Sequence, residues 1–155
     1  EQNRQTMPGS LTGVWAESNT RESIYGALRR RETFATTGTR LQVRFFGGWE
    51  LTDALLNSEN WIQAAYQRGV PMGGDLPAPP AGAGAPAFVI WASKDPAGAN
   101  LDRLQVIKVW EDAGEQQERV FDVAVSQSKN AAGSPELKVV WKDPAFEPQQ
   151  LAAYY

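Results

Sequence analysis

Alternating apolar and polar positions dominate the second half of the chain. Apolar side chains recur at every second position in short runs, a pattern typical of strands with one buried face. Clusters of Asp, Pro, Gly and Ser separate these runs and indicate turns. The runs that we expect to form strands are 87–92, 104–110, 120–125 and 137–141. Short strands at this spacing predict an antiparallel β-sandwich.

The first half of the chain contains an amphipathic helical segment. Ile24, Tyr25 and Leu28 fall on one face of a helix, and we expect this apolar face to stay uncovered within the chain and to be available to a partner. Asn19 precedes the segment and Glu22 follows three residues later, a spacing that allows a reciprocal N-terminal cap. We therefore predict a helix that Asn19 caps.

Short elements surround this helix. A second helix is predicted over 60–68, because its apolar side chains share a face and Gly69 follows it. Gly47-Gly48 is expected to end the last strand before this helix. The strands predicted in this half, from β-prone or alternating composition, are 14–16, 33–37 and 41–45.

A stretch of proline, glycine and alanine at 77–86 divides the chain. Such a composition is typical of a loop or linker. Helix and strand patterns precede it, and strand patterns alone follow it. We therefore expect an α+β chain in three parts: 1–48 with helix and strand patterns, 49–86 as a helical and loop connection, and 87–155 as the sandwich.

Composition excludes several kinds of chemistry. The chain has no histidine and no cysteine, which excludes Ser-His-Asp and Cys-His catalysis, disulfides and ordinary zinc sites. Carboxylate or lysine chemistry and oxygen-ligated Mg²⁺ or Ca²⁺ remain. The net charge of −3 disfavours a nucleic-acid partner, and no apolar run is long enough to span a membrane. The lack of cysteine suits a periplasmic or secreted location, which we favour weakly, but many cytoplasmic proteins share this property.

Two loops carry candidate binding groups. Asp95, Asn100 and Asp102 offer oxygen ligands at a spacing that Ca²⁺ sites use, although a tight turn between two strands explains them as well. In Gly73-Gly74-Asp75, two glycines allow the backbone to approach a ligand closely, and Asp75 adds a carboxylate. A structural turn is the alternative for this loop too.

Six tryptophans invite a second kind of functional hypothesis. Aromatic faces bind sugars, but three of the six fall at the ends of predicted strands, where sandwich cores use large aromatic residues. We therefore favour a core role for most of them. The tryptophans are Trp15, Trp49, Trp61, Trp91, Trp110 and Trp141.

Several runs of the sequence together resemble a known group of enzymes, the PHP-type (polymerase and histidinol phosphatase) metallohydrolases, in the branch that includes carbaryl-hydrolase-like enzymes. Within that branch the chain most resembles the domain-of-unknown-function family 3604. The similarity extends in order from about residue 11 to residue 155. The runs that carry it are 13–17, 19–24, 27–38, 43–49, 69–76, 94–96 and 100–103.

The resemblance implies that this chain is the C-terminal accessory region of a metal-dependent hydrolase of phosphoesters or related esters. Residues 1–48 would close the PHP-like region, whose divalent metal and histidine ligands lie upstream, so no catalytic residue, cofactor or metal ligand is assigned here. The candidate binding residues are Glu17, Gly73, Gly74 and Asp75. The expected partner is the N-terminal PHP-like part of the same protein, or a second copy of the chain.

The resemblance also implies a further strand after Tyr155, so we expect the sandwich to lack a strand at that end. The alternative to an accessory region is a free-standing β-sandwich module that binds a glycan or a protein.

Overall fold

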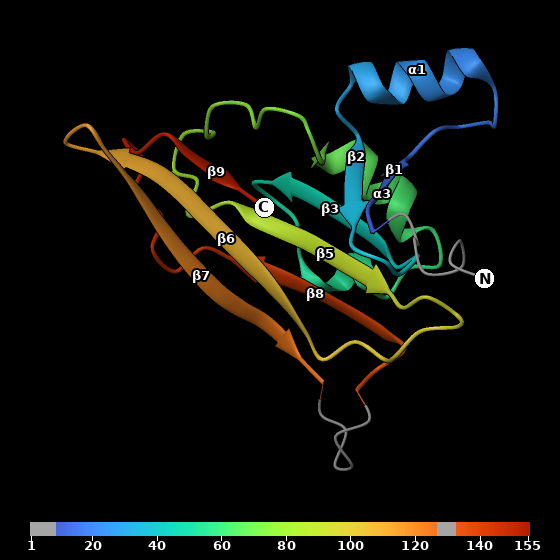
Figure 1. Ribbon diagram of the computed structural model, residues 1–155. Coiled ribbons are helices and arrows are strands. Elements are labelled where there is room, and N and C mark those ends of the chain that lie inside the picture. The colour runs from blue at the N-terminus through green and yellow to red at the C-terminus, as the bar shows by residue number, and fades with distance from the viewer. Residues whose placement is uncertain (1–8, 127–132) are drawn as a thin grey trace.

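The computed structural model describes residues 9–126 and 133–155 (Figure 1). Three helices and nine strands are assigned within these residues. The helices are α1 (Arg21–Arg29), α2 (Asp53–Leu56) and α3 (Trp61–Arg68). The strands are β1 (Leu11–Val14), β2 (Thr33–Thr36), β3 (Gln42–Gly48), β4 (Val70–Pro71), β5 (Ala87–Ser93), β6 (Arg103–Asp112), β7 (Glu115–Val125), β8 (Glu136–Lys142) and β9 (Ala152–Tyr154).

The strands form three antiparallel sheets. A four-stranded sheet has the order β4-β3-β5-β8, a three-stranded sheet has the order β7-β6-β9, and β1 and β2, which α1 connects, form a two-stranded sheet. In the four-stranded sheet, Phe45 lies opposite Ile90, and Ile90 lies opposite Val139. The prediction of a strand-rich, antiparallel fold is therefore confirmed.

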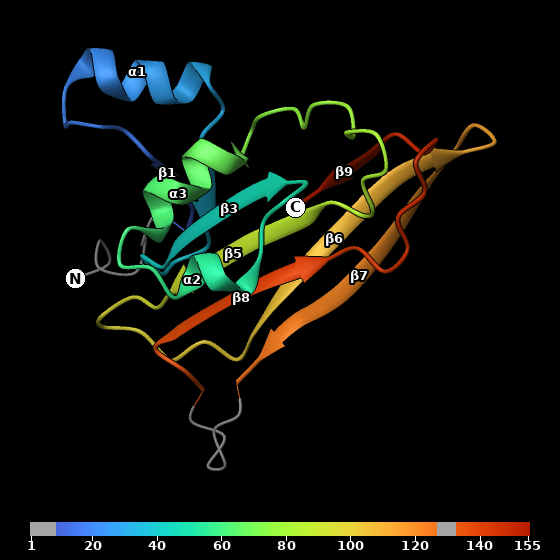
Figure 2. The same cartoon turned by 180° about the vertical axis from the view of Figure 1, so that it is seen from behind.

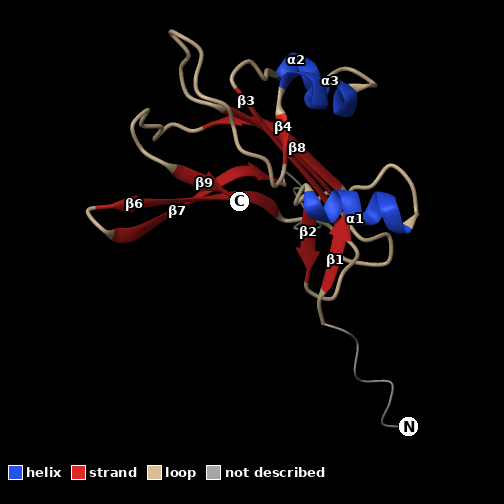
Figure 3. Cartoon of the chain, turned by 90° about the horizontal axis from the view of Figure 1, so that it is seen from above, coloured by secondary structure: helices blue, strands red, loops and turns tan. Residues whose placement is uncertain are grey.

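The four-stranded sheet is covered on both faces, as Figures 2 and 3 show. One face packs against α2 and α3 through Phe46, Val89, Leu55 and Ala65. The other face packs against the three-stranded sheet. Successive residues of a strand point to opposite faces, so Phe45 and Phe88 enter the second core while their neighbours enter the first. This double burial explains why β5 is apolar almost throughout rather than alternating.

The β1–β2 sheet and α1 lie beside this layered body, with α1 standing apart from the sheets (Figure 1). The helix buries Ala27, whereas Tyr25 and Leu28 are 62% and 46% exposed. The apolar face of this helix is therefore largely uncovered within this chain, as expected from the sequence. The helix is also capped by Thr20, whose Oγ1 accepts a hydrogen bond from the backbone N–H of Ser23, and not by Asn19.

The strands and the second helix predicted from the pattern of positions are confirmed, with changes at their ends. The strand predicted at 14–16 lies earlier, at Leu11–Val14. Gly47-Gly48 does not end β3 but pairs with Phe88 and Ala87 inside the sheet. A Cβ on Gly48 would lie 2.9 Å from Leu51 Cγ, so glycine serves close packing here instead of a turn.

Three elements were not predicted: α2, β4 and β9. The last one, Ala152–Tyr154, pairs with Lys108–Trp110 along β6 and completes the three-stranded sheet. The division of the chain at residues 48 and 86 stays a prediction. The two strands on either side of the dividing segment, β3 and β5, are neighbours in one sheet. None of the helices among the described residues is both long and apolar enough to cross a membrane.

Candidate functional site

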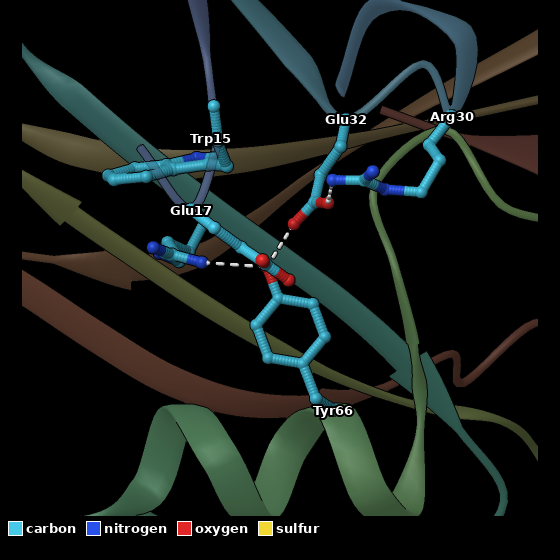
Figure 4. Close-up of a pocket in the computed structure, with 7 residues that line it drawn as sticks. Trp15, Glu17, Arg30, Glu32 and Tyr66 are labelled. Carbon is cyan, nitrogen blue, oxygen red and sulfur yellow. Dashed lines mark hydrogen bonds and ion pairs between the residues drawn. The ribbon is translucent and has the colours of Figure 1, made fainter. Parts of the chain in front are cut away.

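Four separate elements bring polar and aromatic side chains together beside the four-stranded sheet (Figure 4). Trp15 follows β1, Glu32 precedes β2, Arg44 lies on β3 and Tyr66 lies on α3. The backbone N–H of Trp15 donates to the Glu32 carbonyl at 3.0 Å, which continues the pairing of β1 with β2 by one residue pair. Trp15 and Glu32 thus form one wall of a pocket, on the face of the four-stranded sheet that α3 covers.

Glu32 is the buried carboxylate of this pocket, with 3% of the residue exposed. Its Oε1 accepts a hydrogen bond from the Tyr66 hydroxyl, and its Oε2 lies 3.4 Å from an Arg30 guanidinium nitrogen. Arg31 adopts a positive φ of 60°, which turns the chain after α1 and lets the Glu32 N–H donate to the Ala27 carbonyl at 3.1 Å. The local turn thus directs a charged side chain inward, where two donors compensate its burial.

Arg44 is the second fixed charge. Its guanidinium carbon lies 3.6 Å from the centre of the Trp15 ring, a cation–π contact, and its Nη1 donates to the Tyr66 hydroxyl oxygen at 3.0 Å. The Trp15 ring is held in turn, because its Nε1 donates to the Val43 carbonyl at 2.9 Å. Among the described residues, Arg44 forms no ion pair with a carboxylate. Its remaining N–H donors are therefore available to a ligand.

Tyr66 joins the two charged groups. Partial burial of the phenol raises the pKa of Tyr66 above its ordinary value, and the hydrogen bond to Glu32 and its negative charge raise this pKa further. The neighbouring Arg44 opposes the shift. The ring is also supported from behind, because it packs edge-on against Phe46 with 5.0 Å between ring centres. The hydroxyl is thus protonated at neutral pH and donates toward Glu32.

The space enclosed by these residues is about 510 Å³. Glu17, a residue predicted from the sequence to bind, lines this pocket and is exposed. Two carboxylates and two guanidinium groups therefore surround it together with one phenol. Groups of this kind bind and orient a polar ligand through charge-assisted hydrogen bonds. We call it the Trp15–Tyr66 pocket; its lining residues are Trp15, Ala16, Glu17, Arg30, Glu32, Arg44 and Tyr66.

The other predicted binding residues, Gly73, Gly74 and Asp75, line a different and larger space of about 1220 Å³. A Cβ on Gly73, which has a φ of 80°, would overlap the Arg31 carbonyl oxygen. Asp75 is 93% exposed at its side chain and forms an ion pair with Arg31 at 3.4 Å. The glycines therefore allow this loop to pack on the turn after α1. The structure does not bring the loop together with Glu17 in one pocket.

The loop at 95–102 uses its carboxylates for internal contacts. Asp95 accepts from the backbone N–H groups of Arg40 at 2.7 Å and Ala97 at 2.9 Å. These hydrogen bonds lower the pKa of Asp95, because they stabilise the charged form. Asp102 pairs with Arg103 at 2.7 Å.

The residues of this chain do not fit the metal centre of a hydrolase. In the part of the chain that the structure describes, no three side chains of His, Cys, Asp or Glu come together as a group that could hold a metal ion. The two carboxylates that do share a pocket, Glu17 and Glu32, share it with two guanidinium groups.

Sequence reasoning missed three residues that form the centre of the pocket: Glu32, Arg44 and Tyr66. Arg44 gave no signal of its own, since it occupies a regular polar position of the alternating run Leu41 to Phe45. The three residues come from parts of the chain up to 34 positions apart. They come together only because the β1–β2 sheet and α3 pack beside β3. All six tryptophans are half-buried, which agrees with a packing role for most of them.

The amino-acid sequence matches the model of one protein family over residues 1–132 and 126–155, practically the whole chain. That family is described as proteins of unknown function, DUF3604, the family 3604 that the sequence resembles. No curated protein matches the chain, and no solved structure does. On the strength of the family match, the chain belongs to the DUF3604 family.

Proposed function

We propose that this chain is the C-terminal accessory region of a PHP-like, metal-dependent hydrolase of phosphoesters or related esters. In this proposal the upstream, N-terminal part of the protein holds the divalent metal centre. The present chain supplies the Trp15–Tyr66 pocket, which binds a part of the substrate that does not itself react. Binding energy from such remote groups positions the reacting bond at the metal centre.

The observation that carries this proposal is the fixed geometry of Arg44 and Tyr66. Arg44 is held between the Trp15 ring and the Tyr66 hydroxyl, and Tyr66 is held by Glu32. Neither group has to be ordered when a ligand arrives, so less entropy is lost on binding. The β1–β2 sheet, β3 and α3 thus hold the Arg44 guanidinium at the edge of a pocket. A surface with a purely structural role does not require this arrangement.

The exposed face of α1 supports an association with the N-terminal part of the same protein. Tyr25 and Leu28 lie on this helix and are 62% and 46% exposed. Burial of a leucine or an aromatic side chain contributes about 1.5–3 kcal/mol, so a partner that covers both gains stability. Self-association of the chain through this face is the alternative outcome.

Steady-state kinetics of the longer protein test the hydrolase function. We expect metal-dependent hydrolysis of p-nitrophenyl phosphate or p-nitrophenyl acetate by the longer protein, and none by this chain alone. Arg44→Gln should raise KM for the natural substrate class while leaving the metal content unchanged. Arg68→Gln is the matched control, because Arg68 is an exposed arginine at the end of α3 outside the pocket.

Hydrolysis by the isolated chain, or a longer protein inactive with every divalent metal and both esters, would contradict the proposal. The second result would favour the free-standing binding module instead. The Trp15–Tyr66 pocket is compatible with that function as well.

Light scattering tests the association. The isolated chain mixed with the N-terminal part should form a stoichiometric complex, which the double variant Tyr25→Ser, Leu28→Gln should weaken. Val120→Thr is the control, since Val120 is 48% exposed but lies on β7, away from α1. A chain that stays monomeric and forms no complex with the N-terminal part would contradict the proposed association.

A further inference from the structure

We infer that the Trp15–Tyr66 pocket binds a small monocarboxylate that carries hydroxyl groups, as a sugar acid does. This inference rests on the proposed function, in that it names the kind of group the pocket holds for the parent enzyme. It concerns binding alone, and it can be tested on this chain without any turnover.

Arg44 provides the anion-binding group. Its guanidinium is fixed by the Trp15 ring at 3.6 Å and donates one hydrogen bond, to the Tyr66 hydroxyl at 3.0 Å. A guanidinium has five N–H donors in a planar fork that matches the two oxygens of a carboxylate. Since no carboxylate among the described residues pairs with Arg44, an anion from outside can complete its coordination.

The balance of charge limits that anion to a single negative charge. Glu32 and Arg30 form an ion pair at 3.4 Å, so the charge of each is compensated within the pocket. Arg44 then contributes one positive charge, while Glu17 contributes an exposed negative charge to the same lining. Because the Arg44 guanidinium neutralises only one negative charge, the second charge of a phosphate monoester stays uncompensated beside Glu17.

Apart from the two guanidinium groups, the charged side chains of the pocket are acceptors, which suits hydroxyl groups on the ligand. An ionised carboxylate such as Glu17 only accepts hydrogen bonds, and the Tyr66 O–H is already directed toward Glu32. The volume of about 510 Å³ lies in the range of small-molecule sites, roughly 300–1,000 Å³. A hydroxylated ring with one carboxylate fits this combination of size, charge and acceptors.

Titration calorimetry on the isolated chain tests the inference with three ligands that share a hexose ring. Glucuronate carries one carboxylate, glucose carries no charge, and glucose 6-phosphate carries a phosphate. We expect glucuronate to bind at least tenfold more tightly than either of the others. Equal or tighter binding of glucose would show that the anion plays no part, and tighter binding of glucose 6-phosphate would overturn the charge argument.

Variants locate the binding. Arg44→Gln should weaken glucuronate binding at least tenfold, and Arg44→Lys should also weaken it, because a lysine keeps the charge but not the planar fork. Tyr66→Phe should weaken it less, and Arg68→Gln should leave it unchanged. Near-UV circular dichroism verifies that each variant is folded. If Arg44→Gln does not fold, the comparison of wild type with Arg44→Lys still tests the inference.

Glucuronate binding that is undiminished in both Arg44 variants, or absent from the folded wild-type chain, would overturn the inference. Failure of the proposed function appears elsewhere, as missing hydrolysis by the longer protein while glucuronate still binds to this chain.

Discussion

Lys108 and Asp143 form a buried ion pair that ties the two large sheets together. The Lys108 ammonium lies 2.9 Å from Asp143 Oδ2, and the two side chains are 2% and 0% exposed. Lys108 comes from β6 of the three-stranded sheet, whereas Asp143 directly follows β8 of the four-stranded sheet. The Tyr154 hydroxyl and the Ala145 backbone N–H also donate to Asp143, at 2.9 Å and 2.8 Å, so the burial of its charge is compensated.

Removing the negative partner of this pair should destabilise the fold strongly. Asp143→Asn leaves the Lys108 ammonium buried without a compensating charge, and we expect a loss of about 3–5 kcal/mol in the free energy of unfolding. Urea denaturation measures this loss. The control is Asp122→Asn, which breaks an exposed pair with Arg103 at 3.4 Å and should cost at most about 1 kcal/mol. Similar losses in the two variants would show that the buried pair has no special role.

The titration of Tyr66 should respond to its two charged neighbours in opposite directions. Its pKa is raised above the ordinary 10.0, so the neutral phenol contributes stability below pH 10 that is lost as the pH rises through the folded-state pKa. The difference in tyrosinate absorbance between wild type and Tyr66→Phe isolates this titration. Glu32→Gln should lower the midpoint, and Arg44→Gln should raise it. A wild-type midpoint at or below 10.0 would contradict the arrangement of the pocket.

The N-terminal cap of α1 gives a direct comparison of two adjacent residues. Thr20→Ala removes the side-chain oxygen that accepts from the Ser23 N–H at 3.3 Å, which should cost about 1 kcal/mol of stability. Asn19→Ala should cost much less, because Asn19 is exposed and is not the cap. Thermal unfolding of the two variants measures the difference. A larger loss in Asn19→Ala would restore the cap expected from the sequence.

Two glycines with nearly the same positive φ allow backbone strain to be separated from steric overlap of an added Cβ. Gly73 and Gly82 have φ of 80° and 79°, but only a Cβ on Gly73 meets other atoms. Gly82→Ala should cost about 1–2 kcal/mol, the penalty of a left-handed conformation. Gly73→Ala should cost clearly more, because the added methyl group also displaces the Arg31 carbonyl. Equal losses in chemical denaturation would mean that the loop simply moves away.

Glu17 should control which anion the Trp15–Tyr66 pocket prefers. Glu17→Gln removes a negative charge from the lining while keeping the size of the side chain. The affinity for glucose 6-phosphate relative to glucuronate should therefore rise several-fold in calorimetric titrations, since repulsion of the second charge is relieved. Glu118→Gln, on the exposed part of β7, should leave this ratio unchanged. An unchanged ratio in Glu17→Gln would remove Glu17 from the site.

The strands after the linker were predictable, because alternation of apolar and polar positions is a local property. Local patterns did not reveal the roles of single polar residues within those strands. Lys108 follows Val106 on the inward face of β6, a position where a charge is unexpected. Only the arrival of Asp143 from the other sheet makes it stable there. The same limit applies to Asn19 and Thr20, since either residue type can cap a helix and the backbone decides which one does.

By itself the sequence determined the antiparallel, strand-rich character of the chain, the approximate place of most elements and the absence of histidine and cysteine chemistry. These follow from the period of the side chains along the backbone and from composition. The tertiary structure alone decided that β3 pairs with β5, that β9 completes the three-stranded sheet, and that Glu32, Arg44 and Tyr66 meet in one pocket. The physical reason is that sheet order and pocket geometry depend on contacts between distant segments, whose free energy is set by packing rather than by any local pattern.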